Sequence, residues 1–413
     1  MSYTFPNGFL WGTGTAAHQV EGNNTNSDFW VMEHLPGTIF VEPSGDAIDH
    51  YHRYAEDIKL LAELGFNSYR FSIEWARVEP EEGYFSQTEL DHYSRMLEAC
   101  HAHGMQPVLT YHHFTSPRWL ISKGGWKNPD TAGRFADYCE RVTKDLGDQI
   151  ALACTINEAN IPAMFRTLFW GQQELDEGQA AFANASAAAL GTTRERLAPF
   201  LFTGTDDANA VILSAHRQAG AAIRATRSNL PVGMTLALQD MQAADGGTEI
   251  RDQMRQTIQD TFLAAAADDD FLGVQTYSRI RIGPEGPLGP EDGVELTQMG
   301  YEFWPEALEA TIRYAVNATG LPIYVTENGI GTDDDARRQA YYRRALRSVA
   351  ACLEDKMDIR CYFCWSAFDN FEWMMGYQPK FGLIAVDREN QRRSVKETAR
   401  WLGQIAQTNS LEL

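Results

Sequence analysis

Short apolar runs alternate along the chain with longer segments in which apolar residues recur every three to four positions. The short runs are rich in β-branched and aromatic residues and end in turn-forming or polar residues, which is typical of buried strands. Strands alternating with helices predict parallel βα units. The predicted strands span residues 9–14, 66–72, 106–113, 150–158, 231–238, 271–277, 322–327 and 359–366, and the predicted helices span residues 47–64, 88–103, 129–146, 208–227, 249–267, 305–319, 335–354 and 395–406.

Strand and helix segments in this number predict an α/β fold, a single (β/α)8 TIM barrel with elaborated loops at the C-terminal face of the strands. Two long segments without a regular period are the expected loops. Residues 159–205 have an Ala-rich centre and are expected to form short helices over the barrel mouth, and residues 282–300 are rich in Gly and Pro. Because no low-complexity linker divides the chain, residues 1–413 are predicted to form one domain.

The charge of the chain narrows the possible partners. It carries 35 basic and 56 acidic side chains, for a formal charge of −21. Such a surface repels nucleic acid and anionic membranes, so neither is an expected partner. No apolar run reaches the ~18 residues that cross a membrane, and the first residues lack the basic and apolar regions of a signal peptide. A cytoplasmic protein is expected.

Cysteines and histidines at suggestive spacings do not predict a metal site. The six cysteines are scattered through apolar segments, as buried free thiols in a reducing compartment would be. Cys361 and Cys364 have a metal-like spacing, but residues three apart on a strand face opposite sides. The adjacent His112 and His113 also point to opposite faces of their strand, so at most one of them reaches a common site.

Two glutamates end predicted strands in matching contexts. Glu327 follows the apolar segment 321–325 and precedes Asn328-Gly329, and Glu158 follows Thr155-Ile156-Asn157. A carboxylate at the C-terminal tip of a barrel strand is badly placed for packing, but it lies where barrel enzymes form their active sites. The pair therefore predicts one site with two carboxyl groups, as acid/base and nucleophilic catalysis require.

Other polar and aromatic residues are expected at the same end of the barrel. Amide, imidazole and carboxylate groups supply donors and acceptors for hydroxyls, and aromatic rings stack on the C–H faces of sugars. This combination favours a neutral polyol as the ligand. The residues are Gln19, Arg70, His113, Asn157, Tyr277, Trp365, Glu372 and Trp373.

At these residues the sequence resembles glycoside hydrolase family one, the β-glucosidase and β-galactosidase family, over nearly the whole chain. Thr155-Ile156-Asn157-Glu158 is similar to the family's acid/base segment, and Val325-Thr326-Glu327-Asn328-Gly329 is similar to its nucleophile segment. The segments 69–75 and 365–373 match closely as well. The resemblance implies a retaining β-glycosidase that works through a covalent glycosyl-enzyme on a small-molecule β-glycoside, without a cofactor or metal.

The resemblance also implies a role for each matching residue. Glu327 would be the nucleophile and Glu158 the acid/base, while Arg70 and Tyr277 would keep Glu327 ionised. The remaining residues would bind the glycone, with Trp365 stacked beneath it. They are Gln19, His113, Asn157, Trp365, Glu372, Trp373 and Phe381.

Three residues depart from the family pattern near the catalytic pair. Ala159 replaces the usual Pro after the acid/base Glu, Phe114 follows His113 in place of Trp, and Gln275 replaces the usual Asn two residues before Tyr277. These changes are expected to alter the outer wall of the pocket, and with it the preference for the leaving group. Together with the segment 159–205 over the mouth, they predict hydrophobic or aryl aglycones.

Alternative functions differ in their sequence requirements. A non-catalytic sugar-binding barrel is expected to have lost a catalytic Glu, and a thioglucosidase is expected to carry Gln in place of Glu158. A transglycosylase that uses the same intermediate is not separable by sequence, nor is the oligomeric state. Family members that cleave 6-phosphoglycosides lack the Glu of the Phe-Glu-Trp motif, so Glu372 predicts unphosphorylated β-glucosides as substrates, with β-galactosides or β-fucosides as further ones.

Overall fold

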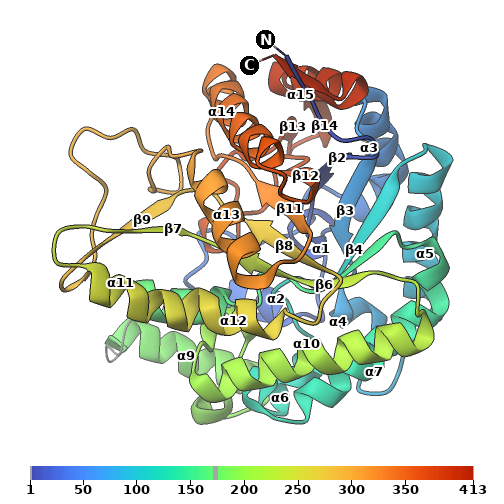
Figure 1. Cartoon of the computed structure of the whole chain (residues 1–413). Helices are drawn as coiled ribbons and strands as arrows, with labels where there is room; N and C mark the ends of the chain where they lie inside the picture. The colour runs from blue at the N-terminus through green and yellow to red at the C-terminus, as the bar shows by residue number, and fades with distance from the viewer. Residues whose placement is uncertain (1, 171–174, 413) are drawn as a thin grey trace.

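The computed structural model describes residues 2–170 and 175–412, and its centre is a closed barrel of parallel strands (Figure 1). Hydrogen bonds join these strands in chain order, and the last strand closes on the first. The fold predicted from the alternating pattern is confirmed. The barrel strands are β2 (Leu10–Gly14), β3 (Ser68–Ser72), β4 (Gln106–His112), β5 (Leu152–Ile156), β6 (Val232–Ala237), β8 (Phe271–Gln275), β11 (Ile323–Asn328) and β12 (Ile359–Trp365).

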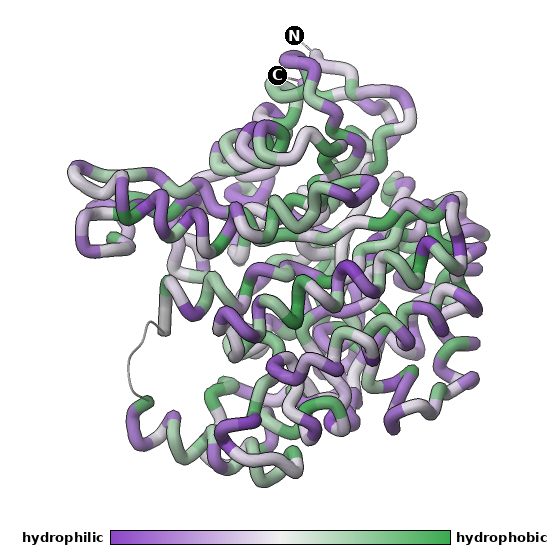
Figure 2. The backbone as a smooth tube through the Cα atoms, turned by 60° about the horizontal axis from the view of Figure 1, so that its bottom comes forward, coloured by the Kyte–Doolittle hydropathy of each residue, from purple (hydrophilic) through white to green (hydrophobic). Residues whose placement is uncertain are grey.

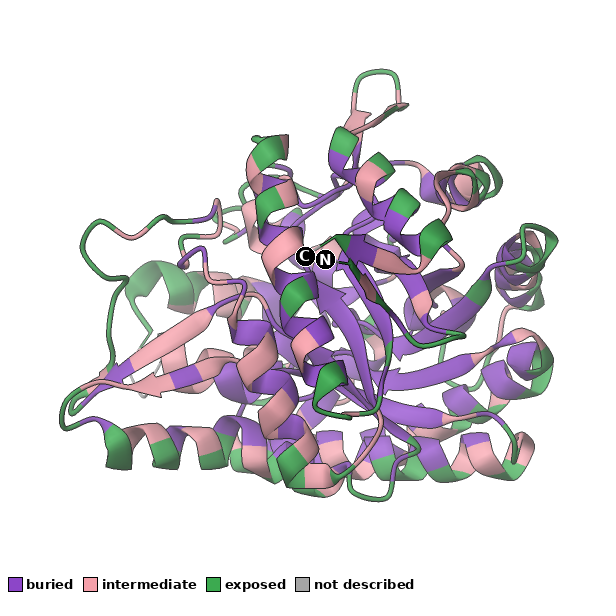
Figure 3. Ribbon diagram, turned by 45° about the horizontal axis from the view of Figure 1, so that its top comes forward, coloured by how far each residue is buried: buried purple, intermediate pink, exposed green. Residues whose placement is uncertain are grey.

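Helices cover the outside of the barrel, with their buried residues toward the strands and their exposed residues outward (Figure 3). In α7, for example, Phe135, Tyr138 and Val142 are buried, and their spacing gives one apolar face. The same alternation of hydropathy is visible along the other helical turns (Figure 2). The helices that follow the barrel strands in turn are α3 (His50–Leu64), α5 (Gln87–Ala102), α7 (Thr131–Leu146), α10 (Asp206–Thr226), α11 (Thr248–Arg255), α13 (Ala307–Thr319), α14 (Asp335–Glu354) and α15 (Glu397–Thr408).

Shorter helices lie in the connections. The segment 159–205 contains α8 and α9, as its irregular pattern predicted, although residues 171–174 lie outside the described residues. Among the described residues, none of the helices combines the length and the apolar character needed to cross a membrane. The remaining α-helices of the described chain are α1 (Ala17–Val20), α2 (Asp28–Glu33), α4 (Trp75–Val78), α6 (Arg118–Ser122), α8 (Ile161–Phe165), α9 (Glu177–Ala189) and α12 (Thr261–Ala265).

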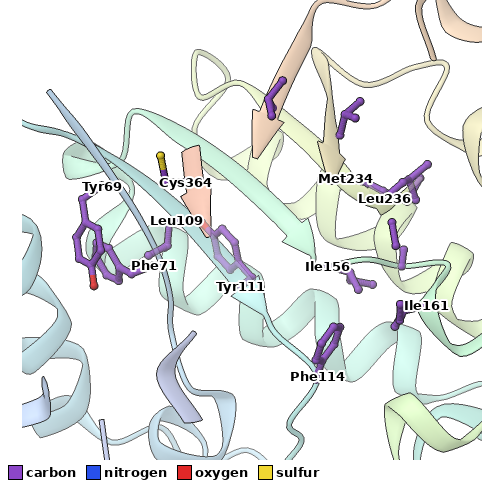
Figure 4. Packing of buried hydrophobic residues seen from close by; sticks show 14 of the residues in the cluster. Tyr69, Phe71, Leu109, Tyr111, Phe114, Ile156, Ile161, Met234, Leu236 and Cys364 are labelled. Carbon is purple, nitrogen blue, oxygen red and sulfur yellow. The ribbon is translucent and has the colours of Figure 1, made fainter. Parts of the chain in front are cut away.

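Alternation along β12 separates two apolar cores. Cys361 and Phe363 point into the barrel, whereas Tyr362 and Cys364 pack outward against the helices. Cys361 and Cys364 therefore face opposite sides of the sheet, as predicted from their spacing. Figure 4 shows part of the outer core around Cys364. Inside, a Cβ atom on Gly12 would lie 2.4 Å from the ring of Phe363, so glycine at this position makes room for that ring.

Outside the barrel, the described residues form three small sheets that were not predicted. β7 (Asp240–Ala243), β9 (Arg279–Gly283) and β10 (Gly286–Pro287) form one sheet, so the prediction that residues 282–300 are all loop is wrong at its start. β13 (Ile384–Asp387) and β14 (Arg392–Val395) pair antiparallel. β1 (Ser2–Thr4) and β15 (Ser410–Glu412) also pair antiparallel, which brings the two ends of the chain together (Figure 1).

Candidate active site

A cavity of about 520 Å³ opens at the C-terminal ends of the barrel strands. Most of the predicted site residues line it, although they come from segments spread over the chain. Arg70 and Gln19 do not line it and instead support residues that do. The predicted residues that line the cavity are His113, Asn157, Glu158, Tyr277, Glu327, Trp365, Glu372, Trp373 and Phe381.

Glu327, near the end of β11, is held by several donors. The Arg70 guanidinium lies 2.7 Å from Oε1, and the Tyr277 hydroxyl donates a 2.6 Å hydrogen bond to Oε2. Burial raises the pKa of Glu327, while the charge of Arg70 and the hydrogen bond from Tyr277 oppose that rise. Both contacts stabilise the ionised carboxylate, so Glu327 is the more acidic member of the pair.

Glu158 occupies a strained turn just beyond β5. Its φ is 45°, a left-handed conformation that costs a non-glycine residue about 1–3 kcal/mol. Thr235 of β6 fixes this turn, because its hydroxyl accepts from the Glu158 amide at 3.0 Å and its carbonyl accepts from the Ala159 amide at 3.1 Å. Burial, and next the negative charge of Glu327, raise the pKa of Glu158 well above its ordinary value. Both effects favour the protonated form of the carboxyl.

Asn157 and His113 form a polar pair beside Glu327. Arg70 donates to Asn157 Oδ1 at 2.5 Å, and the Asn157 amide nitrogen lies 3.1 Å from His113 Nε2. Burial, and next the charge of Arg70, lower the pKa of His113 well below its ordinary value, so the ring is neutral. The neighbouring His112 packs away from the cavity against Trp126, as its place on the opposite strand face predicted.

Glu372 and two indole rings line another part of the cavity. Trp365 and Trp373 each stack on His113, with ring centroids 5.7 and 5.9 Å apart. The Glu372 carboxyl accepts from Asn370 at 3.2 Å and from Gln19 at 3.4 Å. Burial, and next the charge of Glu327, raise the pKa of Glu372 to about 8. A protonated Glu372 can both donate to and accept from a sugar hydroxyl.

Much of the lining of the cavity, apart from the residues around the catalytic pair, is apolar. Of the three departures from the family pattern, only Phe114 lines it. Ala159 is fully buried at the turn after Glu158, and the Gln275 amide contacts Asn157 and Glu327, so the expectation that both alter the outer wall is wrong. The residues that form the apolar wall are Phe114, Ile161, Met164, Phe165, Leu168, Leu201, Ile280, Pro287, Leu288 and Pro290.

Comparison with known proteins identifies the chain. A model of glycosyl hydrolase family 1 matches residues 1–191 and 289–411. The chain belongs to glycosyl hydrolase family 1. It is therefore a glycoside hydrolase of the β-glucosidase type, and family 1 enzymes act with retention of configuration.

Relatives and solved structures agree with this assignment over almost the whole chain. A bifunctional β-D-glucosidase/β-D-fucosidase of Bifidobacterium breve is 33% identical over 97% of the chain and 98% of the relative. β-Glucosidase A of Thermotoga maritima is 30% identical over 99% of each. The crystal structure of β-glycosidase BGL167 is similar at a TM-score of 0.94, with 54% identity over 98% of this chain and 97% of that one.

Three further residues of the family 1 enzyme lie in or beside the cavity, and the sequence patterns did not predict them. Thr235 holds the turn at Glu158, and its only signal was a hydroxyl near the end of an apolar strand. Asn370 supports Glu372 from within the segment 365–373. Tyr301 lines the cavity directly after the segment 282–300, and nothing in the sequence around it indicated this role. Burial, and then the nearby charges of Tyr341, Glu372 and Glu158, raise the pKa of Tyr301.

Proposed function

We propose that this enzyme hydrolyses unphosphorylated β-D-glucosides, and also β-fucosides and β-galactosides, with Glu327 as the nucleophile and Glu158 as the acid/base. The observation that carries the proposal is the contrast between two buried carboxyl groups in one cavity. Arg70 and Tyr277 stabilise the charge of Glu327, whereas burial and the charge of Glu327 raise the pKa of Glu158 and favour its protonated form. The glucosidase/fucosidase relative from Bifidobacterium breve supports the choice of sugars.

In the first step, a Glu327 oxygen attacks the anomeric carbon and forms an ester bond as the bond to the leaving-group oxygen breaks. Glu158 gives its proton to that oxygen, which leaves as an alcohol. We assign the 2-hydroxyl of the glycone to Asn157 and a further glycone hydroxyl to His113, and these contacts hold the ring over Trp365. Their fixed geometry lowers the entropic cost of reaching the transition state.

In the second step, Glu158 acts as the base. Once Glu327 is esterified, it no longer carries the negative charge that helps to raise the pKa of Glu158. The pKa of Glu158 therefore falls, and its carboxylate can take a proton from water. The water oxygen attacks the anomeric carbon, the ester bond breaks, and Glu327 leaves as a carboxylate while Glu158 regains its proton.

The proposal is tested with a panel of nitrophenyl glycosides followed by NMR. We expect hydrolysis of the β-glucoside, with β-glucose as the first product and the α-anomer appearing only by mutarotation. α-Glucosides are the matched control and should remain intact. Hydrolysis of the α-glucosides, or α-glucose as the first product from the β-glucoside, would contradict the assigned chemistry.

Glu372 is expected to discriminate against 6-phosphorylated substrates, most strongly at alkaline pH. Its pKa of about 8 means that the carboxyl gains a full charge only above that pH. A dianionic phosphate ~4 Å away would then be repelled by several kcal/mol at an effective dielectric of ~20. We expect kcat/KM for an aryl β-glucoside to exceed that for its 6-phosphate about a thousandfold at pH 9, and by less at pH 6.

Nearby cations do not offset this repulsion. Among the described residues that line the cavity, the lysine and arginine side chains are Arg279 and Arg281. Both are paired with acidic groups, and the Lys380 ammonium donates to the Tyr377 carbonyl at 2.6 Å. In the control variant Glu372→Gln, residue 372 carries no charge at either pH. The ratio of kcat/KM for the glucoside to kcat/KM for its 6-phosphate should therefore lose the part of its pH dependence that comes from this carboxyl. Comparable turnover of both substrates at pH 9 would refute the role given to Glu372.

The apolar outer wall is expected to favour aryl and alkyl aglycones over cello-oligosaccharides. Leu288 lines this wall, whereas Leu296 is exposed to a similar degree but does not line it. Leu288→Ser should lower kcat/KM for an octyl or naphthyl β-glucoside roughly fivefold through lost apolar contact, while Leu296→Ser should not. A higher kcat/KM on cellotetraose than on every aryl β-glucoside would overturn this expectation.

The proposal also includes the domain organisation of the chain and its location in the cell. The family relatives align over nearly their whole length, which supports residues 1–413 acting as one catalytic domain. The cysteines are all free and buried, which supports a reducing, cytoplasmic location.

A further inference from the structure

Gln275 is the last residue of β8 and lies beneath the catalytic cavity. Its backbone is directly opposite that of Glu327 in the parallel ladder between β8 and β11. The side chain is fully buried and does not line the cavity. Its amide nitrogen donates at 2.9 Å to Asn157 Oδ1 and at 3.0 Å to Glu327 Oε1. One amide group therefore joins two groups that face the substrate.

The donors and acceptors around Gln275 permit only one orientation of its amide. The Arg70 guanidinium has no acceptor atom and donates to Asn157 Oδ1 as well as to Glu327 Oε1. Both neighbours of Gln275 therefore present acceptors, and only its NH2 group can satisfy them. The cost is visible in the structure, because the buried Gln275 Oε1 has no hydrogen-bond partner.

The same chain of hydrogen bonds continues to His113. Because Asn157 Oδ1 accepts from Arg70 and Gln275, the Asn157 nitrogen is the atom that faces His113 Nε2. A neutral His113 then accepts at Nε2 and carries its proton on Nδ1. Without Gln275, Asn157 would lose one of the donors that fix its amide orientation.

We propose that Gln275 is a positioning residue that holds the Glu327 carboxylate and the Asn157 amide in one fixed relative orientation. This inference rests on the proposed function, in which Glu327 attacks the anomeric carbon and Asn157 binds the adjacent 2-hydroxyl. One shared donor on β8 fixes the two groups relative to each other, although they come from β11 and from the end of β5, which are not adjacent in the barrel. It also adds a third side-chain donor to Glu327, besides Arg70 and Tyr277, and so favours its ionised form.

The test compares Gln275→Met, which has a similar length and no donor, with Gln275→Glu, which replaces the donor by a carboxyl. Thr13→Val is the matched control, because Thr13 is a buried strand residue whose hydroxyl has no partner. We expect Gln275→Met to lower kcat/KM on nitrophenyl β-glucoside about 10- to 100-fold. The control should retain the wild-type value.

Two readouts separate positioning from a general loss of structure. On the 2-deoxy β-glucoside, which lacks the hydroxyl assigned to Asn157, the loss in Gln275→Met should be several times smaller than on the parent substrate. The acidic limb of the kcat/KM–pH profile should move upward by ~1 unit in Gln275→Met, and further in Gln275→Glu because a second carboxylate adjoins Glu327. Each variant's melting temperature establishes that it is folded.

The outcomes are distinct from those that test the proposed function. Equal losses on both substrates, or coincident pH profiles for the wild type and both Gln275 variants, would overturn the positioning role. If Gln275→Met does not fold, the profile of Gln275→Glu decides alone. A wild-type protein inactive on every β-glycoside would instead refute the proposed function, whatever the behaviour of Gln275.

Discussion

Replacing Glu327 by Gln is expected to lower kcat on aryl β-glucosides by about 10,000-fold or more, as removal of a catalytic nucleophile does. The amide keeps the size of the side chain but cannot form the glycosyl ester. In the wild type, the Arg70 guanidinium lies 2.7 Å from the charged Glu327 Oε1, whereas in the variant it would lie beside a neutral amide. Steady-state rates with nitrophenyl β-glucoside measure the loss. A 2-fluoro glycosyl inhibitor should label the wild type on the peptide that contains Glu327.

Glu302 provides a control for this prediction. It is another carboxylate that lines the cavity, but it is paired with Arg279 at 2.5 Å. Within the described residues, it forms no hydrogen bond with Glu158 or Glu327. Glu302→Gln should change kcat by less than tenfold, because the amide keeps the size of the side chain and an acceptor oxygen for Arg279. Inhibitor attached to Glu302, or substantial activity in Glu327→Gln, would show that the nucleophile is misassigned.

Replacing Glu158 by Ala is expected to slow hydrolysis in proportion to how much the leaving group needs a proton. For a dinitrophenyl glucoside, which leaves readily as an anion, glycosylation should be nearly normal. For an alkyl glucoside, kcat/KM should fall by about 100- to 10,000-fold, the usual contribution of general acid catalysis. Because Glu158 must be protonated to act, its removal should also flatten the alkaline limb of the pH profile with phenyl substrates.

Azide distinguishes loss of the acid/base from general damage. In Glu158→Ala, azide can enter the space left by the carboxyl and attack the glycosyl-enzyme without base assistance. We expect faster turnover of the dinitrophenyl substrate and a β-glucosyl azide product, whereas the wild type should show neither. An α-glucosyl azide, or an equal loss on dinitrophenyl and alkyl glucosides, would contradict the role given to Glu158.

The regular elements were predictable because each carries its own local signal. The helix predicted at residues 335–354 has the observed bounds of α14, since its apolar face repeats through its full length. β1 and β15 were missed because their pairing joins residues about 400 positions apart, and three-residue strands have no period of their own. β9 and β10 were missed because Gly and Pro in their hairpin hid a short pairing.

In the site, it was easier to predict which residues take part than to predict where their side chains point. Glu158 and Glu327 stand at strand ends, where the barrel itself decides what they face. Gln275 also stands at a strand end, but its amide points beneath the cavity to Asn157 and Glu327 rather than to the outer wall. The elevated pKa of Glu372 depends on burial and on the charge of Glu327, and neither is visible in a local motif.

The position of the antiparallel pair β1–β15 determines where the enzyme can be immobilised or fused without covering its active site. The strand ends near Leu10, Leu152 and Ile359 share a surface with residues 6–9, on the face opposite the catalytic cavity. Trp11 donates to the Asn409 side chain at 2.9 Å, which anchors the C-terminal segment to that same face. A solid support or fusion partner joined through β1 or β15 would therefore leave the mouth of the cavity open to incoming glycosides.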